Sequence, residues 1–413
     1  MSKEKILIIA VKKPNQQDDL FESSLQELIS LADTAGGEVL EVVTQNRERI
    51  HSAFYIGEGK MAEIKEIIDQ LDIELIIAND ELSASQSRNL SQFLNTRVID
   101  RSQLILDIFA GRARTKEGKL QVELAQLEYL LPRLRGQGVA LSRLGGGIGT
   151  RGPGETKLET DRRHISRRID DIKRGLKQVV KQRNQYRKRR KTNDVFQIAI
   201  VGYTNAGKST LFNRLTNSES LEENKLFATL DPLTRKIHFP SGFESLLTDT
   251  VGFIQHLPTT LIAAFRSTLE EVKEADFILH VVDSSHPDHE QHQKTVIRLL
   301  EELDSSTIPM LTVYNKKDLL EKDFIPMNHP YIMISAYNNE DLLRLREKVE
   351  EVLKEEWESY QIRVKADNGQ LLNRLGHETI ITEKKFDNET ETYVVSGYIR
   401  MDHPLQGTVK EKA

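Results

Sequence analysis

The sequence has 413 residues, enough for two to four domains, and carries 58 Lys and Arg against 63 Asp and Glu. It contains no Cys, which excludes disulfides, thiolate metal sites and cysteine nucleophiles. The apolar runs are far shorter than the ~20 residues that a membrane helix needs, and the short apolar start does not resemble a signal peptide. We therefore expect a cytoplasmic protein with no membrane span.

Residues 1–111 alternate between strand and helix patterns. Strands are predicted at 6–11, 38–43, 74–78 and 98–99, and helices at 18–35, 60–71 and 83–94. This alternation predicts a small parallel α/β domain. The sequence Gly57-Glu-Gly-Lys60 opens the second helix, and we interpret it as a plain helix start.

Residues 112–192 hold most of the positive charge. Positions 112–191 contain 23 Lys and Arg against 8 Asp and Glu, whereas the rest of the chain contains 35 against 55. Two apolar series step by four and three residues, which predicts two helices packed as an antiparallel hairpin: Leu120, Leu124, Leu127, Leu131 and Leu134, then Ile165, Ile169, Ile172, Leu176 and Val179. A second helix of ~25 residues would reach roughly 35–40 Å.

The segment 136–154 between these helices holds 8 of the 23 glycines, with Arg143, Arg151 and Lys157 in or beside it. Residues 162–191 add 14 Lys and Arg but only Asp170 and Asp171. The alternative for a charge run is a solvated helix face. The lack of compensating acids favours an RNA-binding arm with a glycine-rich tip.

Residues 193–356 return to α/β alternation, with strands predicted at 196–201, 245–248, 277–282, 310–314 and 331–334. Residues 202–209 read Gly-Tyr-Thr-Asn-Ala-Gly-Lys-Ser, a phosphate-binding loop between a strand and a helix. Lys208 is expected to bridge the β- and γ-phosphates, and Ser209 to ligate Mg²⁺. Residues 357–413 predict a small α+β module, with a helix at 371–375 and strands at 379–386 and 392–401.

Three later motifs follow predicted strands. Asp249 can hold Mg²⁺ and Gly252 can meet the γ-phosphate. Asp318 in Asn-Lys-Lys-Asp can accept hydrogen bonds from guanine, which selects GTP over ATP. Ser335-Ala336 can offer a backbone N–H to the guanine O6. Thr229 is our choice for the second Mg²⁺ hydroxyl, with Thr234 as the rival.

Together, the segments 202–210, 227–231, 249–252, 315–318 and 335–337 resemble translational GTPases of the Obg–HflX group. The stretches 227–235 (FATLDPLTR) and 144–164 (LGGGIGTRGPGETKLETDRRH) are similar to HflX-type GTPases in particular. The resemblance covers nearly the whole chain and is weakest over the last ~50 residues. It implies a GTP hydrolase that binds the large ribosomal subunit and its rRNA and splits stalled or stress-inactivated ribosomes.

The site residues follow from these motifs and the resemblance. Catalytic roles are expected for Lys208, Thr229, Gly252 and Asn205, and Mg²⁺ ligation for Ser209, Thr229 and Asp249. Nucleotide contacts are expected from Gly202, Tyr203, Thr204, Asn205, Ala206, Gly207, Lys208, Ser209, Thr210, Phe227, Ala228, Thr229, Leu230, Asp231, Asp249, Thr250, Val251, Gly252, Asn315, Lys316, Lys317, Asp318, Ser335, Ala336 and Tyr337.

Phe253 stands where Ras-type proteins have the Gln that orients water, so we expect slow hydrolysis that the ribosome accelerates. Asn205 resembles the position that some GTPases use beside a bound K⁺; alternatively, it only braces the loop. The histidines, including His286, His289 and His292, lack metal-ligand spacing and are expected on the surface.

The predicted fold class is α/β multidomain: an N-terminal parallel α/β domain (1–111), a basic antiparallel hairpin (112–192) with its glycine-rich tip, a P-loop GTPase domain (193–356) and a small α+β module (357–413). We expect a monomer. Two other functions stay open: a GTP-dependent ribosome-assembly or tRNA-binding factor, and a GTP-regulated RNA-binding protein that does not hydrolyse GTP.

Overall fold

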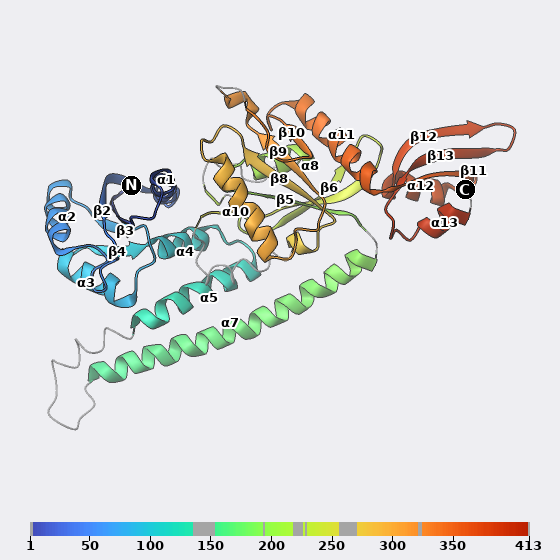
Figure 1. The fold of residues 1–413 in the computed structure, drawn as a ribbon. Helices are drawn as coiled ribbons and strands as arrows, with labels where there is room; N and C mark the ends of the chain where they lie inside the picture. The colour runs from blue at the N-terminus through green and yellow to red at the C-terminus, as the bar shows by residue number, and fades with distance from the viewer. Residues whose placement is uncertain are drawn as a thin grey trace. The chain divides into compact units, whose positions relative to one another are not determined.

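The computed structural model describes residues 3–134, 153–192, 195–217, 226–227, 229–255, 271–320 and 324–411. The chain divides into two compact units (Figure 1). The first comprises Met1–Lys181, Lys225–Asp231 and Gln255–Arg266, and the second comprises Gln182–Asn224, Pro232–Ile254 and Ser267–Ala413. The boundaries of the four domains expected from the sequence stay a prediction.

The first unit is built on a four-stranded parallel sheet with the order β2-β1-β3-β4. Its elements are β1 (Glu4–Lys12), α1 (Asp18–Thr34), β2 (Gly37–Asn46), α2 (Glu58–Leu71), β3 (Leu75–Ala78), α3 (Ala84–Leu94), β4 (Arg97–Asp100) and α4 (Arg101–Arg112). The apolar run of β1 is buried because this strand lies inside the sheet. The expected parallel α/β fold is therefore confirmed, and α4 is an additional helix.

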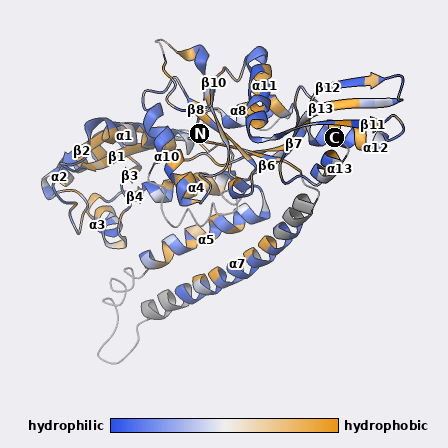
Figure 2. Cartoon of the chain, turned by 45° about the vertical axis from the view of Figure 1, so that its right-hand side comes forward, coloured by the Kyte–Doolittle hydropathy of each residue, from blue (hydrophilic) through white to orange (hydrophobic). Residues whose placement is uncertain are grey.

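Helices α5 (Lys116–Arg133) and α7 (Pro153–Thr192) follow and lie side by side as an antiparallel hairpin (Figure 1). Helix α7 has 40 residues, longer than expected, and is largely hydrophilic (Figure 2). Its predicted seam includes Ile169 and Ile172, which are both buried. Gly175 of α7 faces Leu120 of α5. Most of the glycine-rich tip lies outside the described residues.

Helix α5 has a second packing face that the sequence analysis missed. Val122, Ala125 and Tyr129 are buried, and α5 packs against α3 and α4. The leucines of the predicted seam are only partly buried. Helix α5 therefore has an apolar contact on two sides rather than on the one side that the heptad pattern indicates.

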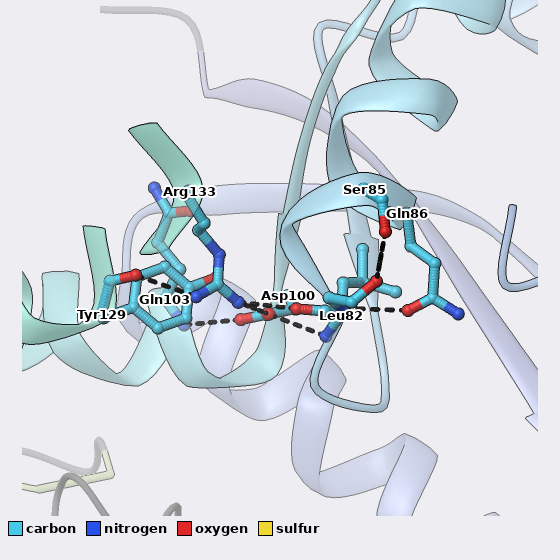
Figure 3. Close-up of polar contacts among 8 residues, drawn as sticks. Leu82, Ser85, Gln86, Asp100, Gln103, Tyr129 and Arg133 are labelled. Carbon is cyan, nitrogen blue, oxygen red and sulfur yellow. Dashed lines mark hydrogen bonds and ion pairs between the residues drawn. The ribbon is translucent and has the colours of Figure 1, made fainter. Parts of the chain in front are cut away.

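A buried aspartate, Asp100, joins β4, α4, α5 and the loop before α3 in the first unit (Figure 3). Its carboxylate accepts hydrogen bonds from the backbone N–H of Leu82 (2.9 Å) and of Gln103 (2.9 Å), and from Nη2 of Arg133 (3.1 Å). The Arg133 guanidinium also lies 3.3 Å from the centroid of the Tyr129 ring, and burial raises the pKa of Tyr129. Asp100 thereby fixes the last turn of α5, from which the glycine-rich segment leaves.

The second unit contains a six-stranded sheet with the order β10-β9-β8-β5-β7-β6, in which only β6 is antiparallel to its neighbour. Its elements are β5 (Gln197–Gly202), α8 (Lys208–Thr216), β6 (Leu233–His238), β7 (Glu244–Asp249), β8 (Phe277–Asp283), α10 (His289–Glu302), β9 (Met310–Asn315), η2 (Lys317–Leu319), β10 (Tyr331–Met333) and α11 (Asn339–Glu356). Edge strand β6 was not predicted, because its sequence mixes polar and apolar residues without a strong strand pattern.

The chain ends in a three-stranded antiparallel sheet with the order β11-β13-β12. It comprises β11 (Glu358–Lys365), α12 (Gly369–Glu378), β12 (Ile380–Asp387), β13 (Thr392–Ile399) and α13 (Gln406–Glu411). The α+β expectation is confirmed, with β11 and α13 as additional elements. Within the parts of the chain that the structure describes, no helix has the length and apolar character to cross a membrane.

Replacing Asp100 by Ala should destabilise the first unit. The substitution leaves the Arg133 guanidinium and two backbone N–H groups without their buried carboxylate, and breaking a buried pair from one side costs about 3–5 kcal/mol. Urea unfolding followed by hydrogen exchange of the β3 and β4 amides measures this loss. Asp33→Ala, at an exposed position, should change stability by less than about 0.5 kcal/mol. An equally small effect of Asp100→Ala would show that Asp100 does not join these elements.

Candidate functional site

The turn between β5 and α8 is shaped by two glycines. A Cβ on Gly202 would clash with the carbonyl oxygen of Val281 on the neighbouring strand. Gly207 has φ 89°, and a Cβ there would clash with the side-chain amide of Asn315. Both positions therefore require glycine, and the turn presents backbone N–H groups at the N-terminus of α8, which favours a bound anion.

Lys208 lies buried inside this turn. Its Nζ donates a hydrogen bond to the carbonyl oxygen of Tyr203 at 2.7 Å. Burial lowers the pKa of Lys208 to about 8; the nearby Asp249 carboxylate opposes this shift and Lys316 adds to it. A phosphate group in the turn would supply the negative charge that favours protonated Lys208.

Ser209 and Asp249 meet beside the turn. The Ser209 hydroxyl donates to Oδ2 of Asp249 at 2.9 Å, and Asp249 is completely buried at the end of β7. A hydroxyl and a carboxylate are hard oxygen ligands of the kind that Mg²⁺ prefers, so the pair fits this ion. Gly252 closes the same space, since a Cβ there would lie 2.8 Å from Cγ2 of Thr204 and 3.0 Å from Nζ of Lys208.

Asn315 joins two loops at the carboxyl edge of the sheet. Its Nδ2 donates to the carbonyl oxygen of Ala206 at 3.0 Å, and its Oδ1 accepts from the N–H of Ala336 at 3.0 Å. The carboxylate of Asp318 is exposed in the short helix η2, and the Tyr337 side chain is 69% exposed. This edge therefore combines loops fixed by hydrogen bonds with two exposed side chains that a planar ligand could contact.

The neighbouring lysines and Ser335 make contacts within the protein. Lys316 Nζ pairs with Asp283 at 2.7 Å, Lys317 pairs with Asp341, and the Ser335 N–H donates to Asp341 at 2.8 Å. These contacts hold the two loops that follow β9 and β10. The side chains of Lys316 and Lys317 therefore stabilise these loops at the carboxyl edge of the sheet.

Phe253 is buried and forms a backbone bridge with the phosphate-binding turn. Its N–H donates to Gly202 at 3.1 Å, and its carbonyl oxygen accepts from the N–H of Thr204 at 2.8 Å. The phenyl ring offers no hydrogen bond to a water molecule. Another group must therefore orient water if the site hydrolyses a phosphoanhydride.

The expectation that the histidines lie on the surface was wrong for His280, His292 and His403, which are all buried. His292 is buried and stacks on Tyr203 with ring centroids 3.7 Å apart, and burial lowers its pKa to about 4. The signal was present in the sequence, because His292, Val296 and Leu300 recur at helical spacing on one face of α10. The described residues contain no group of three or more His, Asp or Glu side chains that could hold a metal ion.

Some predicted site residues belong to the first unit. We call Leu226, Phe227 and Thr229–Asp231 the switch segment; these residues cluster with the first unit, whereas Ser209 and Asp249 belong to the second. Asp231 binds the start of α5, accepting from the N–H of Thr115 at 2.8 Å. Ala228 lies outside the described residues, as do Arg143 and Arg151.

Comparison with known proteins identifies the relatives of this chain. Residues 22–110 match the family described as GTP-binding GTPase N-terminal, 112–190 the GTP-binding GTPase Middle Region, and 197–316 the family described as 50S ribosome-binding GTPase. The GTPase HflX of Alkalihalophilus pseudofirmus is 57% identical over 399 residues, covering 96% of this chain and 94% of that protein. The GTPase HflX of Escherichia coli K12 is 46% identical over 357 residues, covering 85% and 84%.

Among solved structures, a GTP-binding protein from Sulfolobus solfataricus in complex with GDP aligns with a TM-score of 0.45 at 26% identity. The alignment covers 85% of this chain and 99% of that one.

The fold and the sequence matches define a P-loop GTPase with an N-terminal parallel α/β domain and a helical hairpin. The identity over almost the full length goes further: the chain belongs to the HflX GTPase family. It is therefore a GTP hydrolase, and the expected class of enzyme is confirmed. The alternative of a protein that binds GTP without hydrolysing it is set aside.

Replacing Asn315 by Ala should weaken binding of both GTP and GDP by roughly 10- to 100-fold. The change removes two buried hydrogen bonds, each contributing about 1 kcal/mol, and leaves the Ala206 and Ala336 backbone groups without this partner. Titration with a fluorescent guanine nucleotide measures the affinity. Asn373→Ala, at an exposed position on α12, serves as the control; equal affinities of the two variants would contradict a bridging role.

Proposed function

We propose that GTP and Mg²⁺ bind at the carboxyl edge of β5, β7 and β9. The turn 202–210 would hold the phosphates, with Lys208 opposite the β- and γ-phosphates. Ser209 and Asp249 would hold Mg²⁺, and Thr229 of the switch segment would complete its ligands. The metal would neutralise charge that develops on the phosphates. The 2.9 Å contact between Ser209 and Asp249 is the observation that supports this assignment best.

The guanine base would lie against the loops that Asn315 joins. Asp318 would accept from the N1–H and the exocyclic amine, and the Ala336 backbone would meet O6. Tyr337, where many GTPases have Lys, is exposed and can stack against the base. Because adenine presents no matching pair of donors, Asp318 would select GTP over ATP.

We further propose that a bound K⁺ near Asn205 assists hydrolysis, because Phe253 cannot orient water. Asn205 is exposed and has a left-handed backbone with φ 60°. Its amide oxygen would be a ligand for K⁺, while its backbone shapes the turn. Faster hydrolysis in K⁺ than in Na⁺ would support this role. Equal rates in the two salts would mean that Asn205 only braces the loop.

Replacing Asp318 by Asn should transfer the nucleotide preference from guanine to xanthine. The Asn amide can accept from N1–H and donate to the extra carbonyl of xanthine, whereas with guanine its NH₂ group would face the exocyclic amine, a second donor. We expect GTP affinity to fall by more than about tenfold and XTP affinity to rise, since a site with an unmatched buried polar group discriminates strongly. Competition of GTP and XTP against a fluorescent nucleotide tests this. Asp283→Asn, which alters the partner of Lys316, is the control; unchanged GTP selectivity of Asp318→Asn would move base recognition elsewhere.

We propose that the protein binds the large ribosomal subunit and its rRNA, splits stalled or stress-inactivated ribosomes, and hydrolyses GTP faster when bound to them. Membership in the HflX family and the match to a 50S ribosome-binding GTPase domain support the ribosomal partner. The excess positive charge of α7 supports contact with RNA. We expect a cytoplasmic monomer.

The charge pattern of the hairpin indicates which residues would contact RNA. Glu123 and Glu128 of α5 pair with Arg168 and Lys173 of α7, at 2.6 and 2.8 Å. The exposed Lys177 and Lys181 of α7 have no ion pair within the described part of the chain. These two lysines are therefore suitable variants for a test of RNA contact.

The double variant Lys177→Gln/Lys181→Gln should bind ribosomes more weakly and less salt-dependently. Each lysine that contacts a phosphate contributes about one unit to the slope of log affinity against log salt, so the slope should fall by up to about two. Lys294→Gln/Arg298→Gln on α10 removes the same charge from residues paired with Glu290 and Glu302. Equal slopes for both double variants would contradict RNA contact through α7.

Sucrose-gradient centrifugation of 70S ribosomes with the protein tests the function itself. Separation into subunits with GTP, and with a non-hydrolysable analogue, supports splitting by the bound form. Binding to free large subunits or tRNA without separation would favour the alternative, an assembly or tRNA-binding factor. Equal GTP turnover with and without ribosomes would contradict stimulation.

A further inference from the structure

The switch segment is attached to the first unit at three points. The N–H of Leu226 donates to Oγ1 of Thr34, the last residue of α1, at 3.3 Å. The Phe227 ring is buried and packs edge-on against Phe109 of α4, with centroids 4.6 Å apart. The third attachment is Asp231, which binds the N-terminus of α5. Leu226, Phe227 and Asp231 are therefore held by α1, α4 and α5, respectively.

The attachment at Asp231 is the most specific of the three. Its Oδ2 accepts the backbone N–H groups of Arg114 (2.9 Å) and Thr115 (2.8 Å), and its Oδ1 accepts the Thr115 hydroxyl (2.5 Å). A Cβ on Gly118 would clash with this carboxylate, so the close approach requires glycine there. The positive end of the helix dipole also favours a carboxylate at this place.

Thr115 has two roles through one hydroxyl group. Its Oγ1 accepts the N–H of Gly118 at 2.9 Å, which makes it the N-cap of α5. The same hydroxyl donates its proton to Asp231. Since a hydroxyl has one donor and two acceptor sites, both bonds can form together. Helix capping and attachment of the switch segment can therefore be separated by substitution.

Helix α5 is also attached along its length and at its other end. Its face with Val122 and Ala125 packs on the first unit, and Arg133 is fixed by Asp100. Glu123 and Glu128 pair with α7. We call the hairpin of α5 and α7 the arm. A displacement of α7 would therefore be transmitted through these contacts to α5 and its N-terminus, where Asp231 is bound.

We infer that Thr115 is a positioning residue that connects the arm to the GTP site. Through the bond between Thr115 and Asp231, α5 sets the position of Thr229. RNA contact by the arm accelerates GTP hydrolysis by this route. The inference rests on the proposed ribosomal function. It adds a route for the stimulation, which the nucleotide motifs alone do not provide. Because Thr229 would ligate the metal of the bound nucleotide, nucleotide binding and the position of the start of α5 are linked, and for binding free energies such a linkage is reciprocal.

Three substitutions at Thr115 separate attachment from capping. Thr115→Ser keeps the hydroxyl and both bonds. Thr115→Val removes both bonds. Thr115→Asp keeps an N-cap acceptor for Gly118 but places a second carboxylate against Asp231. A residue that only caps the helix would tolerate Ser and Asp alike.

The test measures GTP hydrolysis by full-length protein with and without ribosomes. We expect Thr115→Ser to behave like the wild type, and Thr115→Asp and Thr115→Val to lose about tenfold or more of the ribosome-stimulated kcat, a typical size for coupling between sites. The KM for GTP and sedimentation with ribosomes should be retained. Full stimulation of Thr115→Asp would overturn the inference, and absence of stimulation in the wild type would instead contradict the proposed function.

Hydrogen exchange of the free protein gives a second test that needs no ribosome. The amides of Arg114 and Thr115 are protected by Asp231, so their exchange rates should differ by about threefold or more between GDP and a non-hydrolysable GTP analogue. The strand β12 amides serve as the internal control. Identical exchange at Arg114 and Thr115 in both nucleotide states would overturn the inference, whatever the ribosome assays show.

Discussion

A carboxylate at each end holds helix α5 in place. Asp231 accepts the backbone N–H groups at its beginning, and Asp100 accepts the Arg133 guanidinium at its end. The first turn of any helix has N–H groups without intrahelical partners, and here the partner comes from a residue 116 positions later in the chain. One carboxylate therefore pairs the free N–H groups at the start of the helix and also joins two segments that are distant in the chain.

The second unit uses the same principle at the nucleotide site. The carbonyl oxygen of Ala206 and the N–H of Ala336 lie in different loops, and the Asn315 side chain satisfies both. A buried backbone group without a partner costs about 1–3 kcal/mol, so these loops are held together by the need to pair polar groups. In both units, side chains that connect loops do so because the loops themselves leave backbone groups unpaired.

Much of this organisation could be predicted, because it depends on local spacing. The glycines and Lys208 of the phosphate-binding turn, and the seam with Ile169 and Ile172, follow from residue types at fixed intervals. Helix α4 was missed because it begins directly after β4, with Asp100 as both the last strand residue and the N-cap, so no loop residues mark the boundary. The contact between Asp231 and Thr115 could not be predicted, since nothing near either residue indicates the other.

In the hairpin, apolar burial determines how the helices pack, and the charged residues determine which cations of α7 are paired. Its exposed ion pairs, such as Arg168 with Glu123, are screened by water and contribute little, so they do not determine how the helices pack. Burial of Ile169 and Ile172 on one side of α7 does, at roughly 1.5–3 kcal/mol for each buried side chain. The acids of α5 have a different consequence: they neutralise cations on the side of α7 that faces α5. The exposed Lys177 and Lys181 lie outside these ion pairs, so their charge is available for the RNA contact proposed above.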